Sequence, residues 1–139
     1  AAFLRADATD AQRADAAAAW DAAMRSAGLC VITGVDSVLT KGTLERCEAQ
    51  ARAFFASPAE QKVACAAGRY GERGYCAPGV EAVSRTAEGE PQRPADAVES
   101  FVFWAKAEGE RSPSAAFDSA LRAYWAEVET LMHALMRLS

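Results

Sequence analysis

Residues 54–62 read FFASPAEQK, and this stretch sets the point where two helices meet. The two phenylalanines close the apolar stripe of the preceding helix. Ser57 is a good N-cap, Pro58 suits the first helical position because its missing N–H costs nothing there, and Glu60 can bond back to the Ser57 amide. The sequence therefore predicts a helix, a sharp corner with a capping box, and a new short helix.

Helical periodicity extends to both sides of this corner. Residues 10–27 carry a narrow apolar face and are followed by Gly28, a typical helix stop. A second helix is expected to begin near Thr40 and to end in the two phenylalanines. From about Ser114, a third apolar stripe continues to the end of the sequence, so we expect further polypeptide to bury it. A packed core helix or a short coiled coil would both produce this stripe. Its members are Phe117, Leu121, Tyr124, Val128, Leu131, Leu135 and Leu138.

Two short stretches favour β-strands. Residues 29–33, LCVIT, are rich in branched apolar side chains, which indicates a buried strand. Residues 99–104, ESFVFW, place apolar side chains on both faces and predict a strand that needs cover on both sides. Between them, glycines and prolines interrupt every periodic pattern in residues 68–97, which indicates a long loop. We therefore predict a mostly helical α+β fold, with three or four helices and two short strands.

Composition excludes several classes of protein. A chain of 139 residues suits one domain, and its net charge of −4 comes from interspersed signs without the basic cluster that nucleic acid requires. No apolar run approaches the roughly 20 residues that span a bilayer, and AAFLRADATD at residues 1–10 lacks the charged-then-apolar order that is typical of a signal peptide. The four cysteines fit neither a zinc knuckle nor a dense disulfide scaffold, so reduced thiols and a cytoplasmic location are expected.

Few residues offer chemistry. The sequence holds one histidine, His133, which falls on the face opposite the last apolar stripe and is expected to be a solvated surface residue. The segment GRYGERGY at residues 68–75 has glycines but lacks the lysine of a phosphate-binding loop. It does bring guanidinium groups and phenols together, which either hold an acidic substrate or belong to an ordinary surface loop. The candidate pocket residues are Arg69, Tyr70, Arg73 and Tyr75.

The order of these stretches resembles a known family. A helix ending in AGL, the segment LCVITGV, a helix closing on ARAFFASPAEQK, the loop GERGY and the strand VESFVF resemble the N-terminal region of isopenicillin N synthase-like iron(II)- and 2-oxoglutarate-dependent oxygenases. The resemblance covers roughly residues 16–103, and the final helix looks like the long helix that braces the catalytic barrel in that family. It departs from the family at Ile32-Thr33-Gly34, where members usually show Asn-His-Gly.

The resemblance implies a specific role. The parent protein would hydroxylate, desaturate or ring-close a small molecule with iron(II) and 2-oxoglutarate as cofactors. This chain would be one partial domain, with the dioxygenase region at about 10–104 and a bracing helix at about 114–138. Its partner would be the C-terminal jelly-roll barrel of the parent, whose sheet the two predicted strands would extend. The family binds iron through His-x-Asp and a distant His, so a chain with one histidine would hold no metal and be inactive alone. We take the closing Arg137-Leu138-Ser139 as a chance Arg-x-Ser. The alternative function is a self-contained helical interaction module that uses the apolar seam from Phe117 to Leu138.

Overall fold

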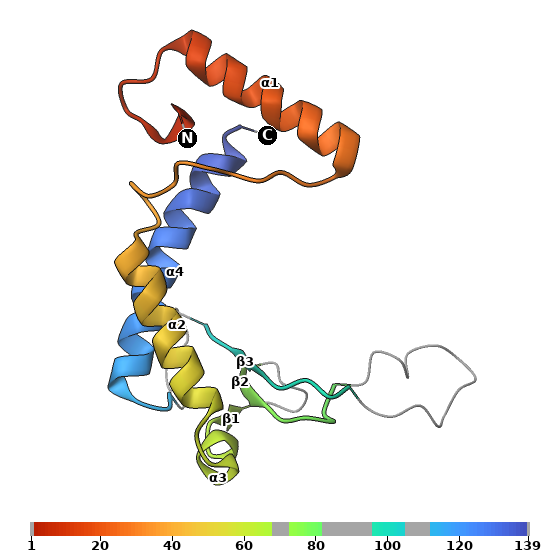
Figure 1. The fold of residues 1–139 in the computed structure, drawn as a ribbon, viewed down its shortest axis with the longest axis vertical. Helices are drawn as coiled ribbons and strands as arrows, with labels where there is room; N and C mark the ends of the chain where they lie inside the picture. Colours follow the sequence, from red (N-terminus) through yellow and green to blue (C-terminus); the bar gives the residue numbers. More distant parts are fainter. Residues whose placement is uncertain (1, 68–72, 82–95, 105–111, 139) are drawn as a thin grey trace, which may run out of the picture. The chain divides into compact units, whose positions relative to one another are not determined.

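The structure, a computed structural model, describes residues 2–67, 73–81, 96–104 and 112–138. Figure 1 shows a mostly helical chain with a small sheet, which confirms the predicted α+β class. The elements are η1 (Ala2–Leu4), α1 (Asp10–Ala27), α2 (Lys41–Phe55), α3 (Ala59–Val63), β1 (Ala66–Ala67), β2 (Arg73–Cys76), β3 (Ser100–Val102) and α4 (Ala115–Met136).

Helix α1 has well-defined ends. Thr9 and Gln12 form a reciprocal capping box at its start, so two otherwise unpaired amides gain acceptors. Gly28 ends the helix in the left-handed region at φ 70°, a conformation that costs glycine little, and donates its N–H to the Met24 carbonyl. The helix buries no side chain completely, which fits its narrow apolar face.

The corner between α2 and α3 forms as predicted, but the capping box does not. Pro58 is the N-cap of α3 and makes no side-chain capping bond. The Ser57 hydroxyl instead donates to the Phe54 carbonyl at 2.6 Å. The Phe54 carbonyl also accepts the Ser57 backbone N–H at 3.0 Å, so Ser57 caps the end of α2 through both its amide and its hydroxyl, and the hydroxyl is not available to cap α3.

The predicted strand at residues 29–33 is wrong. The segment belongs to no strand, and it is not buried: Leu29 is 64% exposed and Val31 is 81% exposed. A strand needs a hydrogen-bonded neighbour, and none of the described strands pairs with this segment. Branched apolar composition alone did not specify a partner.

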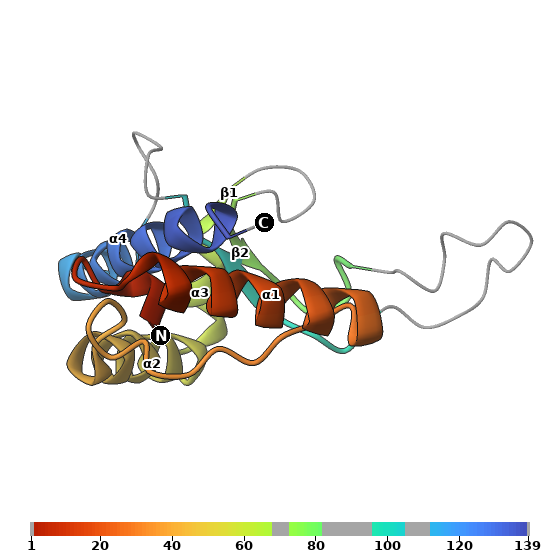
Figure 2. The same cartoon turned by 90° about the horizontal axis from the view of Figure 1, so that it is seen from above.

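The sheet has three antiparallel strands in the order β1-β2-β3. Figure 2 shows β1 and β2 lying side by side. β3 confirms the strand predicted within residues 99–104, whereas β2 lies in the stretch expected to be a loop, which corrects that prediction. The register pairs Tyr75 with Phe101, so both side chains lie on the same face.

Helix α4 confirms the predicted final helix. Ser114 begins it, because its hydroxyl accepts the Phe117 amide at 3.0 Å. Of the predicted stripe, Phe117 and Leu135 are buried, and the five residues between and after them are half-buried. His133 is exposed, as expected from its place opposite the stripe.

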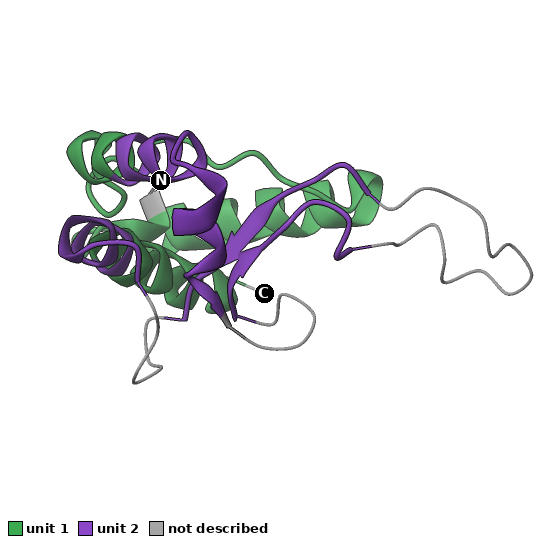
Figure 3. Cartoon of the chain, turned by 90° about the horizontal axis from the view of Figure 1, so that it is seen from below, with its two compact units in different colours: residues 1–46, 123–139 green, residues 47–122 purple. Residues whose placement is uncertain are grey.

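The chain divides into two compact units, residues 1–46 with 123–139 and residues 47–122 (Figure 3). The second unit has an aromatic core in which Phe54 packs on Tyr75, Phe101 and Phe117 with ring centroids 5.1–5.8 Å apart. All four cysteines are free thiols, which confirms the prediction. Within the described ranges, no helix is both long and apolar enough to cross a bilayer.

In the first unit, a carboxylate from α4 completes the start of α2. Glu127 Oε2 accepts the Thr40 N–H at 2.8 Å, and Glu127 Oε1 accepts the hydroxyl of Thr43 at 2.8 Å. These bonds satisfy polar groups at the helix start, among them the buried Thr43 hydroxyl. The Thr40 amide, followed by the Thr43 hydroxyl, holds the pKa of the Glu127 carboxyl below its usual value.

Candidate functional site

The structure places only part of the predicted loop. Arg69 and Tyr70 lie outside the described residues. Arg73 is exposed at the start of β2, with its guanidinium 5.9 Å from the centre of the Trp104 ring. Tyr75 is 5% exposed and points into the core. The two described members therefore differ: Arg73 faces solvent, and Tyr75 packs inside.

The Tyr75 hydroxyl belongs to a polar cluster at the edge of this core. It donates to Glu99 Oε2 at 2.6 Å, and Lys62 Nζ donates to the same oxygen at 2.7 Å. Lys62 also donates to the Phe55 carbonyl at 3.2 Å. The cluster thus ties α3 and the end of α2 to the sheet through a charge-assisted pair.

The charges in this cluster shift one another in a consistent way. The Lys62 ammonium and, to a smaller extent, the Tyr75 hydroxyl hold the pKa of the Glu99 carboxyl below its usual value. The same carboxylate raises the pKa of Lys62 and of Tyr75. Ionised glutamate, protonated lysine and neutral tyrosine are therefore the stable states. This stabilises the contact between these elements, and it makes the three groups poor general acids or bases, which must exchange protons.

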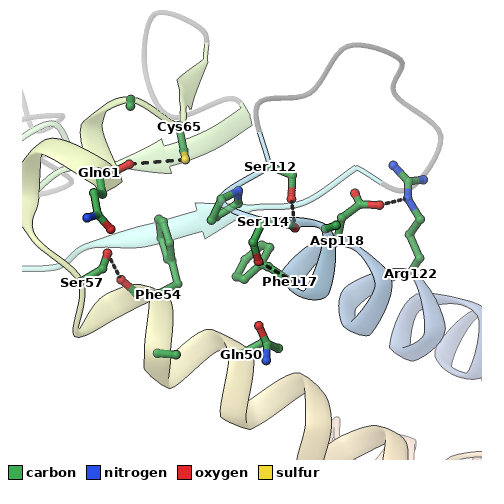
Figure 4. A pocket seen from close by; sticks show the side chains of 14 residues that line it. Gln50, Phe54, Ser57, Gln61, Cys65, Ser112, Ser114, Phe117, Asp118 and Arg122 are labelled. Atoms are coloured by element: carbon green, nitrogen blue, oxygen red, sulfur yellow. Dashed lines mark hydrogen bonds and ion pairs between the residues drawn. The ribbon is translucent and has the colours of Figure 1, made fainter.

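A hollow of about 1000 Å³ opens beside this core in residues 47–122 (Figure 4). Its floor is aromatic, because Phe54 from α2 and Phe117 from α4 meet there with centroids 5.4 Å apart. Its rim carries the amides of Gln50 and Gln61 and an ion pair in which Arg122 Nε lies 2.7 Å from an Asp118 oxygen. The hollow therefore combines apolar packing surface with a polar edge.

The nucleophilic groups around this hollow serve the backbone. The Ser57 hydroxyl donates to a carbonyl at the end of α2, and the Ser114 hydroxyl accepts an amide at the start of α4. The Cys65 thiol is buried and donates to the Gln61 carbonyl at 3.5 Å. None of the described residues that line this hollow is a histidine, so its described part presents no Ser-His or Cys-His pair for nucleophilic catalysis.

Sequence reasoning missed Lys62 and Glu99. They lie 37 positions apart and belong to no motif, so nothing local indicated that they meet. Glu99 stood at the start of the predicted strand, where the alternation of β-structure puts it on the same face as Phe101. That alternation was the one available indication that Glu99 faces the core side of the sheet.

Within the described residues, no group of three histidine, cysteine, aspartate or glutamate side chains is placed to hold a metal ion. A search of curated proteins and a search of solved structures each found no match. A family match does exist: residues 3–122 match the family described as non-haem dioxygenase in morphine synthesis, N-terminal. The match spans most of the chain and includes the α2–α3 corner, the sheet and the start of α4. This chain therefore belongs to the family of non-haem dioxygenase N-terminal regions.

Proposed function

We propose that this chain is the N-terminal segment of an iron(II)- and 2-oxoglutarate-dependent oxygenase that hydroxylates, desaturates or ring-closes a small molecule. The family match over residues 3–122 is the observation that carries the proposal. The segment comprises the dioxygenase region at about 10–104 and a bracing helix at about 114–138. The jelly-roll barrel of the same parent chain supplies the catalytic machinery.

The residues present do not fit an iron site. A site with two histidines and one carboxylate needs two imidazoles, and the whole sequence contains only His133. That histidine is exposed on α4 and is followed by Ala134 and Leu135, so it lacks the His-x-Asp spacing. The chain alone is therefore proposed to be catalytically inactive.

Arg73 is the described loop residue best suited to face a substrate of the parent. Its side chain is exposed, and stacking beside Trp104 orients the guanidinium without neutralising its charge. Tyr75 serves the fold, because its hydroxyl is already bonded to Glu99 inside the unit. In the full-length parent, Arg73→Gln is expected to raise KM for an acidic substrate, whereas Tyr75→Phe lowers stability and leaves KM unchanged.

The interaction-module alternative depends on the seam from Phe117 to Leu138. Phe117 is 3% exposed and packs within the aromatic core, and Leu135 is also buried. A seam whose members are already buried or half-buried offers little new area to a partner helix. This burial favours the oxygenase proposal over the module.

Two experiments test the proposal. Anaerobic titration of the 139-residue chain with iron(II) and 2-oxoglutarate is expected to give no one-to-one complex and no succinate. A stoichiometric, 2-oxoglutarate-dependent iron complex would overturn the inactivity of the segment. Sequencing the reading frame of the parent beyond Ser139 is expected to find His-x-Asp, a later His and Arg-x-Ser, and a stop codon directly after Ser139 would overturn the oxygenase proposal.

A further inference from the structure

A second hollow lies in the unit formed by residues 1–46 and 123–139, and its volume is about 580 Å³. Three arginines line it: Arg5 after η1, Arg13 on α1 and Arg137 after α4. None of the described residues that line it is an aspartate or a glutamate. In a chain of net charge −4, the hollow is therefore a local concentration of positive charge.

The three guanidinium groups are not equivalent. Arg5 is neutralised by Asp7, which it binds through two nitrogens at 2.9 and 2.7 Å. Arg13 donates to the carbonyls of Phe3 at 3.5 Å and Arg5 at 3.0 Å, which fastens the N-terminal segment to α1. Arg137 donates from Nε to the His133 carbonyl at 3.2 Å.

Carbonyl oxygens satisfy donors but cancel no charge. Each guanidinium has five N–H donors, so Arg13 and Arg137 keep several beyond the bonds described above. Within the described residues neither guanidinium forms a salt bridge, so both keep their positive charge and the planar donor geometry that binds an oxyanion at two points.

Apolar side chains complete the lining. Leu4, Val38 and Leu138 border the same hollow, together with the small side chain of Ala17. Transfer of apolar surface out of water is favourable, so a hydrocarbon chain that packs against these side chains would lower the free energy of binding. The volume lies in the range of pockets that hold small organic ligands, roughly 300–1,000 Å³.

We propose that this hollow binds an organic anion with a short apolar chain, its headgroup at Arg13 and Arg137 and its chain against Leu4, Val38 and Leu138. Arg13 and Arg137, which form no salt bridge with a described residue, select the headgroup, and the apolar walls select the chain. This site is independent of the iron chemistry proposed for the parent, because it uses only residues of this chain.

Calorimetric titration of the 139-residue chain with octanoate tests the proposal. Octanoate is expected to bind with one-to-one saturation, and octyl phosphate is expected to bind as well, with the stronger of the two identifying the preferred headgroup. Two control ligands are each expected to bind at least about tenfold more weakly than octanoate. Octanol keeps the chain and lacks the charge, and inorganic phosphate keeps the charge and lacks the chain. Octanol binding as tightly as octanoate would overturn the role of the arginines, and phosphate binding as tightly would overturn the role of the walls.

Variants locate the site. Arg137→Gln is expected to weaken octanoate binding by about tenfold, through loss of a charge-assisted hydrogen bond. The matched control is Arg25→Gln, since Arg25 is an exposed arginine of α1 that pairs with Asp21 and does not line the hollow. Ala17→Leu, which fills the hollow and leaves its charge intact, is expected to abolish binding while circular dichroism remains unchanged. Equal effects of the two arginine variants, or full binding by Ala17→Leu, would place the anion elsewhere and overturn the proposal.

Discussion

Replacing Phe54 with alanine should lower the free energy of unfolding of residues 47–122 more than the same replacement at the neighbouring Phe55. Phe54 is 5% exposed and lies at the end of α2, where its ring meets rings from α4 and from two strands. Its centroid lies 5.2 Å from that of Phe55, 5.8 Å from Tyr75, 5.1 Å from Phe101 and 5.4 Å from Phe117. Truncation removes all four contacts at once.

The size of the effect follows from the buried area. A buried phenylalanine removes about 150–250 Å² from water, which at about 25 cal/mol per Å² gives roughly 4–6 kcal/mol as an upper bound. Measured Phe-to-Ala losses in protein cores of about 3–5 kcal/mol agree with this range. We expect a loss of about 4 kcal/mol for Phe54→Ala, a large share of the 5–15 kcal/mol that typically stabilises a domain.

Phe55→Ala is the matched control, because it makes the same change one position along the same helix. Phe55 is only half-buried, so roughly 2 kcal/mol is expected. Urea unfolding followed by circular dichroism gives the free energies, and hydrogen exchange at the amides of Tyr75 and Cys76 reports on this unit alone. Equal losses in the two variants, or unchanged exchange in Phe54→Ala, would refute the assignment of Phe54 as the centre of the core.

Three further predictions concern the polar contacts. Tyr75→Phe should lower the free energy of unfolding by about 1–2 kcal/mol, because it removes a buried bond to a carboxylate, whereas Tyr124→Phe should change it by less than about 0.5 kcal/mol in the same urea assay. The depressed pKa of Glu99 means that its stabilising effect is complete above its ordinary value of 4.5 and is lost as the pH falls through the lower folded value. The stability difference between wild type and Glu99→Gln should therefore shrink in acid, and a difference independent of pH would contradict this. The depressed pKa of Glu127 has the same consequence, so the stability difference between wild type and Glu127→Gln should also shrink below its ordinary value of 4.5. Hydrogen exchange checks this: the variant should protect the Thr40 amide less than wild type at neutral pH, and the two should protect it equally in acid.

The helices could be predicted from the sequence because their information is local. The apolar spacing from Phe117 to Leu138 predicted α4, and the glycine after Ala27 predicted the end of α1. Neither prediction needed information from another segment. The corner at residues 54–62 was predicted for the same reason. Only its hydrogen bonding was predicted wrongly. The Ser57 hydroxyl could cap the start of α3 or the end of α2, and it bonds to the end of α2 because α2 stops just before it.

The pairing of the strands and the polar cluster of Lys62, Tyr75 and Glu99 could not be predicted, because both depend on residues far apart in the sequence. Gly74 appeared to interrupt any strand, yet it is buried in β2 and pairs with Val102 in β3. Lys62 and Glu99 meet only once α3 packs beside the sheet. Among the predicted loop residues, Tyr75 belongs to this polar cluster through its hydrogen bond to Glu99. Nothing in the spacing of GERGY indicated that role.

The failed strand at residues 29–33 bears on the choice between the two functions. An interaction module would expose its apolar seam, yet Phe117 and Leu135 are buried, and the exposed Met132 lies beside the seam. Among the branched apolar residues that the structure describes, the largest exposures are instead those of Leu29 and Val31, in the segment that follows the helix stop at Gly28. Among the described residues, the greatest apolar exposure, that of Val31, therefore lies outside the seam on which the interaction-module alternative depends.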